Sequence, residues 1–252
     1  MQEINRRLCA AVVGGSGGIC AALTRGIARR HIPLFIHGRN PDKLEKIRAE
    51  LAADAVAKVF AEDVSPAGSA GDFAERMAEH CKNTTHYFHA LGPFLEKPLS
   101  ETGEADWDET LYFNLKLPAL CATRLARLMA ERHSRGGSGG VIVLFGGTKT
   151  DTVRPFRTNA AYGAAKTGLA VFAKSLAREY SGKGVSVLTV CPGIVDTEYV
   201  PEEKRNVGKR MMPEARLTTA ADFASFVIDI AFSDRVSLLN GSVLTLDEGM
   251  RI

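Results

Sequence analysis

The chain has 252 residues, of which 45% are hydrophobic and 24% are charged, and its 32 basic residues nearly balance its 29 acidic residues. This length fits a single α/β domain over 1–252, and the composition is that of a globular chain rather than a disordered one. The balanced charge argues against nucleic acid or a membrane surface as a partner, and no stretch approaches the ~20 apolar residues that span a membrane.

The five cysteines are scattered, and no pair has the spacing of a metal site or a redox motif: Cys9, Cys20, Cys81, Cys121 and Cys191. Most of them sit in or beside apolar runs, so we expect buried free thiols in a reducing compartment and no metal. Arg6 and Arg7 precede an apolar run, but glycines follow Val13 too soon for a good signal peptide. The sequence therefore predicts a cytoplasmic protein.

The first predicted elements are a buried strand over 8–13 and a helix over 19–30, joined by a turn of four glycines and a serine. Strand, glycine turn and helix form the context of a phosphate-binding turn, because glycines allow a close approach and a helix N-terminus offers free N–H groups. An ordinary flexible turn is the alternative interpretation. The residues expected to contact a dinucleotide are Gly14, Ser16, Gly17, Gly18 and Ile19.

Strands and helices alternate along the rest of the chain. Strands are predicted over 33–37, 56–60, 85–89, 141–145, 185–190 and 242–246. Helices are predicted from Pro41, with Asn40 as the cap, and over 65–81, 106–133, 160–180 and 219–232; Pro118 should kink the third or sit where no donor is needed. The charged segment 198–216, with two prolines, should be mobile. Strands separated by helices predict an α/β fold with a doubly wound parallel sheet, whose ligand binds at the carboxyl ends of the strands.

The strand ends carry candidate cofactor ligands. An acidic residue after the second strand would bond the 2′-hydroxyl of NAD, but the chain has Arg39 and Asn40 there. Arg39 is suited to the 2′-phosphate of NADP(H), and the alternative is a surface arginine at the start of a helix. Asp63, followed by Val64, is suited to accept from the adenine amino group, to cap the helix expected near Ser65, or to do both.

Tyr162 and Lys166 stand four residues apart, on one face of the helix over 160–180. A tyrosine has a pKa near ~10, and an adjacent positive charge lowers it. The pair therefore predicts a general acid for carbonyl reduction.

With these residues in place, the chain resembles the short-chain dehydrogenase/reductase family over almost its whole length. The order and spacing of its motifs match: the glycine turn, Asp63-Val64, Asn114, Tyr162-x-x-x-Lys166, Pro192-Gly193 with Thr197, and Asp247-Glu248-Gly249.

The resemblance implies a Rossmann-like single domain that uses NAD(H) or NADP(H), with Tyr162 as acid/base. Lys166 would bond the nicotinamide ribose and lower the pKa of the tyrosine, and Asn114 would hold a water in a proton relay. The stretch with Pro192, Gly193 and Thr197 would contact the nicotinamide end, and 198–216 would form a substrate lid. Members are often dimers or tetramers built on two long helices, here 107–133 and 160–180.

The chain also departs from the family pattern. Val13 replaces a threonine, Cys20 replaces the last glycine of the turn, and His89-Ala90-Leu91-Gly92 stands where Asn-Asn-Ala-Gly is usual. Gly147 stands at the position of the catalytic serine, and the loop to Tyr162 is about two residues longer than usual. Thr148 is the nearest hydroxyl and a candidate replacement; the alternative is that it only starts a turn.

Two functions fit these observations. The first is an NADP(H)-dependent oxidoreductase that transfers a hydride to or from a carbonyl, or an activated double bond, of a small-molecule substrate. Its pocket is expected to be partly apolar, with residues such as Phe94, Leu95 and Met212. The second is an NADP-binding protein that has lost efficient turnover and acts as a sensor or partner subunit. The missing serine is the only support for the second.

Overall fold

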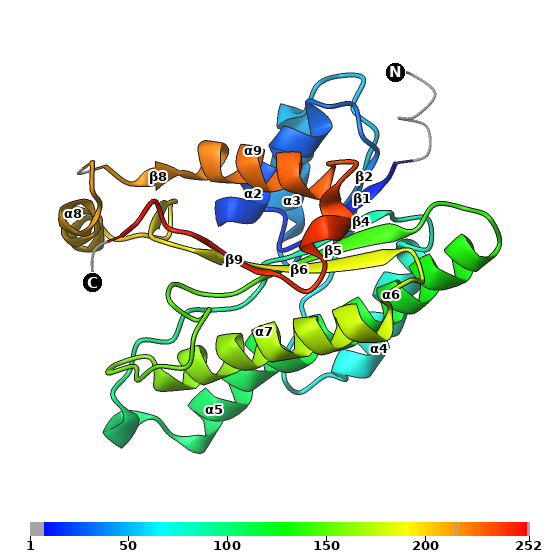
Figure 1. Ribbon diagram of the computed structural model, residues 1–252. Coiled ribbons are helices and arrows are strands. Elements are labelled where there is room, and N and C mark those ends of the chain that lie inside the picture. Colours follow the sequence, from blue (N-terminus) through cyan, green and yellow to red (C-terminus); the bar gives the residue numbers. More distant parts are fainter. Residues whose placement is uncertain (1–7, 215, 251–252) are drawn as a thin grey trace.

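The computed structural model describes residues 8–214 and 216–250, which form a parallel sheet covered by helices on both faces (Figure 1). The sheet has seven strands in the order β3-β2-β1-β4-β5-β6-β9. The strands are β1 (Ala10–Val13), β2 (Leu34–Gly38), β3 (Ala57–Ala61), β4 (His86–His89), β5 (Gly140–Phe145), β6 (Val185–Pro192) and β9 (Val243–Leu246). The doubly wound fold predicted from the sequence is confirmed.

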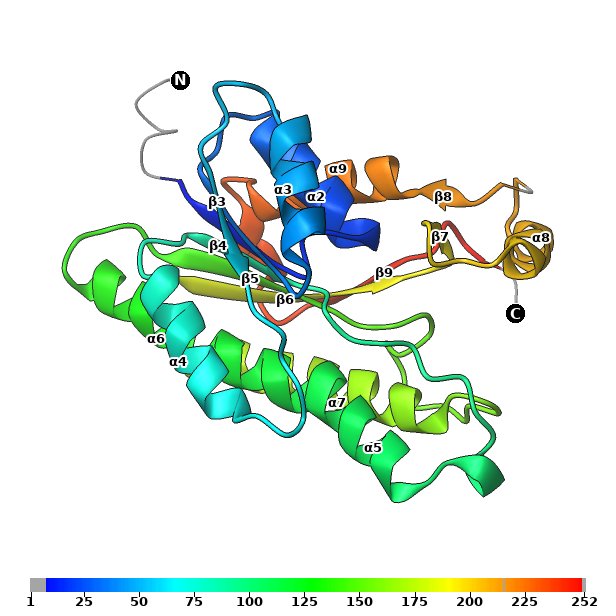
Figure 2. The same cartoon turned by 180° about the vertical axis from the view of Figure 1, so that it is seen from behind.

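One face of the sheet is covered by α2 (Gly18–Ala28), α3 (Pro41–Glu50) and α9 (Ala220–Ala231), and the other by α4 (Ala70–His80), α5 (Glu104–Leu111), α6 (Leu117–Ser134) and α7 (Ala160–Glu179) (Figure 2). Each face has its own buried apolar cluster. Because both faces are covered, β1, β2 and β4 are buried along their whole length. Short 3₁₀ turns lie at Leu99–Glu101 and Val236–Leu239.

The cap of α3 is the predicted one, because the Asn40 side chain accepts a hydrogen bond from the Lys43 amide at 2.9 Å. The start of α4 was predicted wrongly. The helix begins at Ala70, with the Ser69 hydroxyl accepting from the Asp72 amide at 3.1 Å, so Asp63 does not cap it. Ser65 before Pro66 has the same pattern as Asn40 before Pro41, but here the chain forms a turn in which the Gly68 amide donates to the Ser65 carbonyl at 3.0 Å.

The long helix expected over 106–133 is divided. A π-helical turn over Tyr112–Lys116 separates α5 from α6, and the Leu117 amide bonds the Tyr112 carbonyl five residues back. Pro118, which has no amide to donate, follows in the first turn of α6. The wider turn therefore accommodates the proline, and Asn114 lies within it.

The segment expected to be mobile contains a helix, α8 (Glu202–Met211), and its mobility stays a prediction. It is flanked by β7 (Val195–Asp196) and β8 (Thr218–Thr219), which pair in parallel. Met212 is buried in a small cluster with Leu217 and Met250 rather than in an open pocket. Within the described part of the chain, no helix combines the length and apolarity that crossing a membrane requires.

His86 gives a testable prediction about stability. Its ring is buried at the start of β4, stacks on Phe232 with centroids 3.8 Å apart, and its Nε2 lies 3.1 Å from the Ala231 carbonyl oxygen. Burial lowers the pKa of His86 to about 4. The unfolded chain therefore binds a proton that the folded chain excludes between pH 6.5 and 4, so stability falls as pH falls through this range.

From pH 7 to pH 4 we expect this histidine to remove about 3 kcal/mol from the free energy of unfolding. His86→Phe should show a correspondingly smaller loss over the same range in urea denaturation, whatever its stability at pH 7. His133→Gln, at an exposed position, is the control and should follow the parent. Equal pH dependences in the parent and His86→Phe would contradict the assignment.

Candidate active site

The candidate site lies where β1, β2, β4, β5 and β6 end at one edge of the sheet. The register places Val13 level with both His37 and His89, and His89 level with Leu144. The order in which strands are added to the sheet reverses between β1 and β4, because β2 and β3 lie on one side of this pair and the later strands on the other. Ligands of such sheets bind at this switch point.

The glycine turn leaves β1 through a backbone arrangement that needs glycine. Gly14 has a φ of +82°, in the left-handed region. The amides of Gly14 and Gly15 both donate to the His37 carbonyl, at 3.0 and 2.9 Å. A Cβ on Gly15 would lie 2.5 Å from Cγ2 of Ile36, so a side chain there would displace β2. The chain then enters α2 at Gly18, as expected for a phosphate-binding turn.

Ser16, Ile19 and Cys20, which belong to or follow the glycine turn, all pack closely against β1, β2 or the apolar cluster. Ser16 lies at the end of β2, since a Cβ on Gly38 would be 2.9 Å from its hydroxyl oxygen. Ile19 packs against the apolar cluster on this face. The thiol of Cys20 donates to the Val13 carbonyl at 3.3 Å, and burial raises its pKa to about 12. Cys20 therefore fits between helix and strand as a neutral group.

Arg39 follows β2 and is exposed beside the turn. Burial raises the pKa of the nearby Tyr199, and the positive charge of Arg39 opposes that rise. Asn40 uses its side chain to cap α3, so its side-chain oxygen is already engaged. An exposed guanidinium at the end of β2 is the arrangement that suits a 2′-phosphate.

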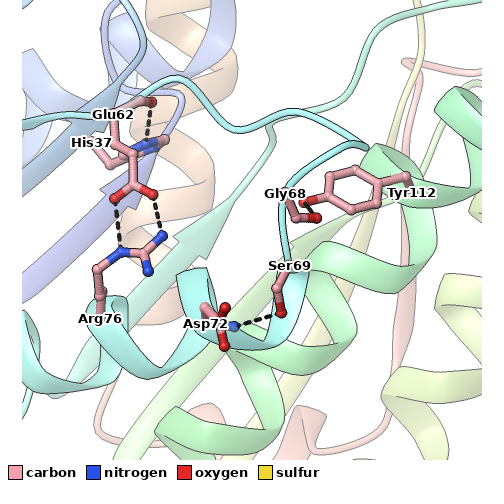
Figure 3. Close-up of polar contacts among 7 residues, drawn as sticks. All are labelled: His37, Glu62, Gly68, Ser69, Asp72, Arg76 and Tyr112. Carbon is pink, nitrogen blue, oxygen red and sulfur yellow. Dashed lines mark hydrogen bonds and ion pairs between the residues drawn. The ribbon is translucent and has the colours of Figure 1, made fainter.

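The loop after β3 is fixed from two sides (Figure 3). The ring of His37 lies with Nε2 3.1 Å from the Glu62 carbonyl oxygen, and Nε of Arg76 on α4 donates to the Glu62 carboxylate at 3.2 Å. Asp63 is exposed next to this anchor, whereas the Val64 side chain is buried in the core. The contacts of Glu62 and the burial of Val64 therefore fix the backbone on both sides of the exposed Asp63.

Tyr162 and Lys166 lie on α7 as predicted, but their electrostatics differ from the expectation. Lys166 is 4% exposed, and its ammonium donates to the Phe145 carbonyl at 2.8 Å and lies 5.8 Å from the centroid of the Tyr162 ring. Burial lowers the pKa of Lys166 to about 8 and raises the pKa of Tyr162. The phenol of Tyr162, whose ordinary pKa is already near ~10, therefore carries its proton at neutral pH.

Gly147 lies directly against Tyr162. A Cβ at this position would be 2.6 Å from Cε1 of Tyr162 and 2.9 Å from its hydroxyl oxygen. The Thr148 hydroxyl donates to the Gly193 carbonyl at 3.2 Å. The Thr150 hydroxyl, fully buried, accepts from the Gly147 amide at 2.8 Å and donates to the Gly147 carbonyl at 3.0 Å. The absence of a side chain at Gly147 therefore leaves room for the Tyr162 ring. The hydroxyls of Thr148 and Thr150 hold the adjacent backbone.

Asn114 is 0% exposed, and its amide nitrogen donates to the Pro93 carbonyl at 3.1 Å. Its Oδ1 finds no hydrogen-bond partner among the described residues. A buried acceptor without a partner is the environment in which proteins hold an ordered water. This is consistent with the relay expected from the family resemblance.

The stretch after β6 borders the same site. The Gly193 amide donates to the Leu246 carbonyl at 3.0 Å, and a Cβ at Gly193 would lie 2.9 Å from Cα of Asp247. Pro192 ends β6, and the Thr197 carbonyl accepts from Arg205 at 2.9 Å. The carboxyl ends of β6 and β9 therefore hold this stretch close to Thr148.

Sequence reasoning named Phe94 as a pocket residue but missed three contacts of the site. Thr150 anchors Gly147, and Phe94 packs its ring against Tyr162 at a centroid distance of 5.0 Å. Glu198 accepts a hydrogen bond from the Gly18 amide at 2.9 Å. Thr150 had a local signal, a hydroxyl three residues after a glycine in a turn, whereas the other two contacts join distant parts of the chain.

A dinucleotide fits these residues. The Cβ positions of Gly15 and Gly17 are already taken by neighbouring atoms, Arg39 is exposed after β2, and Oδ1 of Asn114 has no hydrogen-bond partner among the described residues. Phosphate groups bind where such a turn meets a helix N-terminus.

Comparisons with known proteins agree with this geometry. Residues 14–251 match a family model described as enoyl-(acyl carrier protein) reductase. The D-threitol dehydrogenase of Mycolicibacterium smegmatis is 28% identical over 248 residues, with 96% of this chain and 92% of that protein covered. The 3-oxoacyl-[acyl-carrier-protein] reductase of Rattus norvegicus is 28% identical, with 98% of each chain covered.

Two solved structures of similar proteins share the fold of this chain. A 3-oxoacyl (acyl-carrier-protein) reductase from Agrobacterium tumefaciens, with NADP bound, superposes with a TM-score of 0.84 at 25% identity, covering 96% of this chain and 93% of the other. A short-chain dehydrogenase from Burkholderia cenocepacia in complex with NADP gives 0.82 at 25% identity, covering 96% and 97%. With a family match over nearly its whole length and this fold, the chain belongs to the short-chain dehydrogenase/reductase family of oxidoreductases.

Proposed function

We propose that the protein is an NADP(H)-dependent oxidoreductase that reduces a carbonyl, or an activated double bond, of a small and partly apolar substrate. The observation that carries the proposal is the placement of Tyr162 and Lys166 on one face of α7 at the carboxyl edge of the sheet, with Lys166 buried and Tyr162 half-buried. The NADP bound to the Agrobacterium tumefaciens and Burkholderia cenocepacia relatives supports the choice of cofactor.

The cofactor supplies the hydride when it is bound. The amides at the start of α2 would hold its diphosphate, and the Arg39 guanidinium would pair with its 2′-phosphate. Lys166, held by the Phe145 carbonyl, would place its positive charge beside the cofactor's ribose and the phenol of Tyr162. Asn114 would hold the water that returns a proton toward Tyr162.

Tyr162 is the proposed acid. Its phenol, whose ordinary pKa of ~10 burial raises further, carries a proton at neutral pH and is able to donate it to an oxygen that gains negative charge. Gly147 offers no hydroxyl, and the hydroxyl of Thr148 already donates to Gly193. We therefore infer that Tyr162 is the principal donor to the substrate and that Thr148 holds the loop after β6.

The substrate side is bordered by Phe94 and by α8. Lys204 on α8 pairs with Glu96 and lies 5.3 Å from the centroid of the Phe94 ring. These contacts support a lid that includes α8. The exposed side chains of Leu111 and Val171, on α5 and α7, support the expected assembly of two or four copies through the long helices.

A second function has a specific observation in its favour. The absence of a hydroxyl at Gly147 removes one donor from the site, and a donor of this kind contributes about 10²–10³ in turnover in other enzymes. A protein that binds NADP tightly and turns over slowly, as a sensor or partner subunit, would look the same. The tests below separate the two.

The first test concerns cofactor choice. Arg39→Asp removes one charge-assisted contact, worth about 1.5–3 kcal/mol, so NADPH affinity should fall by roughly tenfold or more while NADH affinity holds. Fluorescence titration of both cofactors measures this. Lys46→Asp, an equal change of charge at an exposed position on α3, is the control. Equal NADPH and NADH affinities in the parent protein would refute the role of Arg39.

The second test concerns the acid. Tyr162→Phe keeps the ring and removes the proton, so turnover should fall by about 10²–10⁴ with little change in NADPH affinity. NADPH oxidation is followed with ketones, quinones and enoyl thioesters as substrates. A fully active Tyr162→Phe variant would exclude the mechanism, and tight NADPH binding without turnover on any substrate would favour the binding protein.

The third test concerns Thr148. If its hydroxyl only holds Gly193, Thr148→Val should lower turnover by less than about tenfold, well short of the loss expected for a transition-state donor. Thr158→Val, on an exposed loop position, is the matched control. A loss of about 10²-fold or more, with unchanged NADPH affinity, would instead make Thr148 the replacement for the serine.

A further inference from the structure

Two residues that follow β7 cover the glycine turn. The Gly18 amide donates to the Glu198 carboxylate at 2.9 Å. The Tyr199 ring lies over the neighbouring backbone, so that a Cβ on Gly17 would be 2.0 Å from its hydroxyl oxygen and a Cβ on Gly18 would be 3.2 Å from the ring. A carboxylate and an aromatic ring thus lie where the turn would receive the cofactor's diphosphate.

The start of α2 explains why a carboxylate is held there. The first turn of α2 contains no acidic residue, and its N-cap, Gly17, has no side chain to accept a hydrogen bond. The free amides and the positive end of the helix dipole attract an anion. Glu198, which is 180 positions away in the sequence, supplies it.

The segment with Glu198 is tied to α8. The Arg205 guanidinium pairs with Asp196 at 2.7 Å and donates to the Thr197 carbonyl at 2.9 Å. The next residue back, Lys204, pairs with Glu96 in the loop after β4. A displacement of Glu198 therefore acts on a segment that contacts both α8 and the substrate side.

We propose that Glu198 and Tyr199 form an internal plug of the cofactor site, which NADPH must displace, so that cofactor binding is coupled to the position of α8. This inference rests on the proposed function, because it takes the turn as the site of the cofactor's diphosphate. A carboxylate and a phosphate cannot accept from the same Gly18 amide. NADPH binds only molecules in which the plug has moved away. The larger the fraction of molecules with the plug in place, the lower the apparent NADPH affinity and the slower the association.

The test uses Glu198→Gln, which keeps the size of the side chain and removes its charge. A carboxylate at an exposed helix N-terminus contributes about 0.3–1 kcal/mol, so NADPH should bind roughly two- to fivefold more tightly to the variant and associate faster. Fluorescence titration and stopped-flow mixing at one low ionic strength measure both. Glu203→Gln, an equal charge change at an exposed position of α8, should match the parent.

Adenosine 2′-phosphate serves as a second probe, because it lacks the diphosphate and should gain nothing from Glu198→Gln. The amide resonance of Gly18 gives a readout without ligand and should shift in Glu198→Gln but not in Glu203→Gln.

A Glu198→Gln variant that binds NADPH no more tightly than the parent would overturn the plug and leave the proposed function intact. An equal gain for adenosine 2′-phosphate would indicate a long-range charge effect and overturn it as well. No NADPH binding by the parent or either variant would overturn the proposed function, and the plug with it.

Discussion

Strand β1 pairs in parallel with β2 along one edge and with β4 along the other, and the loops of the site depend on this double pairing. It brings the ends of β1, β2 and β4 to the same level, so their loops meet around one crevice. The His37 carbonyl then accepts from two successive amides, those of Gly14 and Gly15. These bonds turn the chain away from the sheet at the point where α2 must begin, and the N-terminus of α2 therefore faces the crevice.

Much of the shape of the site depends on glycines, which have no side chain. Gly15, Gly147 and Gly193 each hold a neighbour closer than a Cβ would permit, with distances of 2.5, 2.6 and 2.9 Å from the place that a Cβ would occupy. The polar side chains that remain are held by backbone groups, as Lys166 is by the Phe145 carbonyl. The chemistry of the site thus depends on backbone positions that the sheet sets, and less on contacts between side chains.

Local patterns in the sequence were enough to predict the sheet, the glycine turn and the Tyr162–Lys166 pair, because each depends on residues within a few positions of one another. The start of α4 was mispredicted because two serines near it are both plausible helix starts, and only the packed backbone selects Ser69. The covering of the turn by Glu198 depends on a contact across 180 positions, which no local pattern encodes. The spacing of Tyr162 and Lys166 indicates a nearby charge, but it does not indicate the burial that raises the pKa of Tyr162 in this structure.

The close contact between Gly147 and Tyr162 makes these two positions epistatic. A Cβ at position 147 would lie 2.6 Å from Cε1 of the Tyr162 ring, so a serine there requires the ring or the first turn of α7 to move. The loop over 148–159 joins β5 to α7 and limits that movement. The effect of Gly147→Ser on activity therefore depends on the residue at 162 and on the length of this loop, and not on the serine alone.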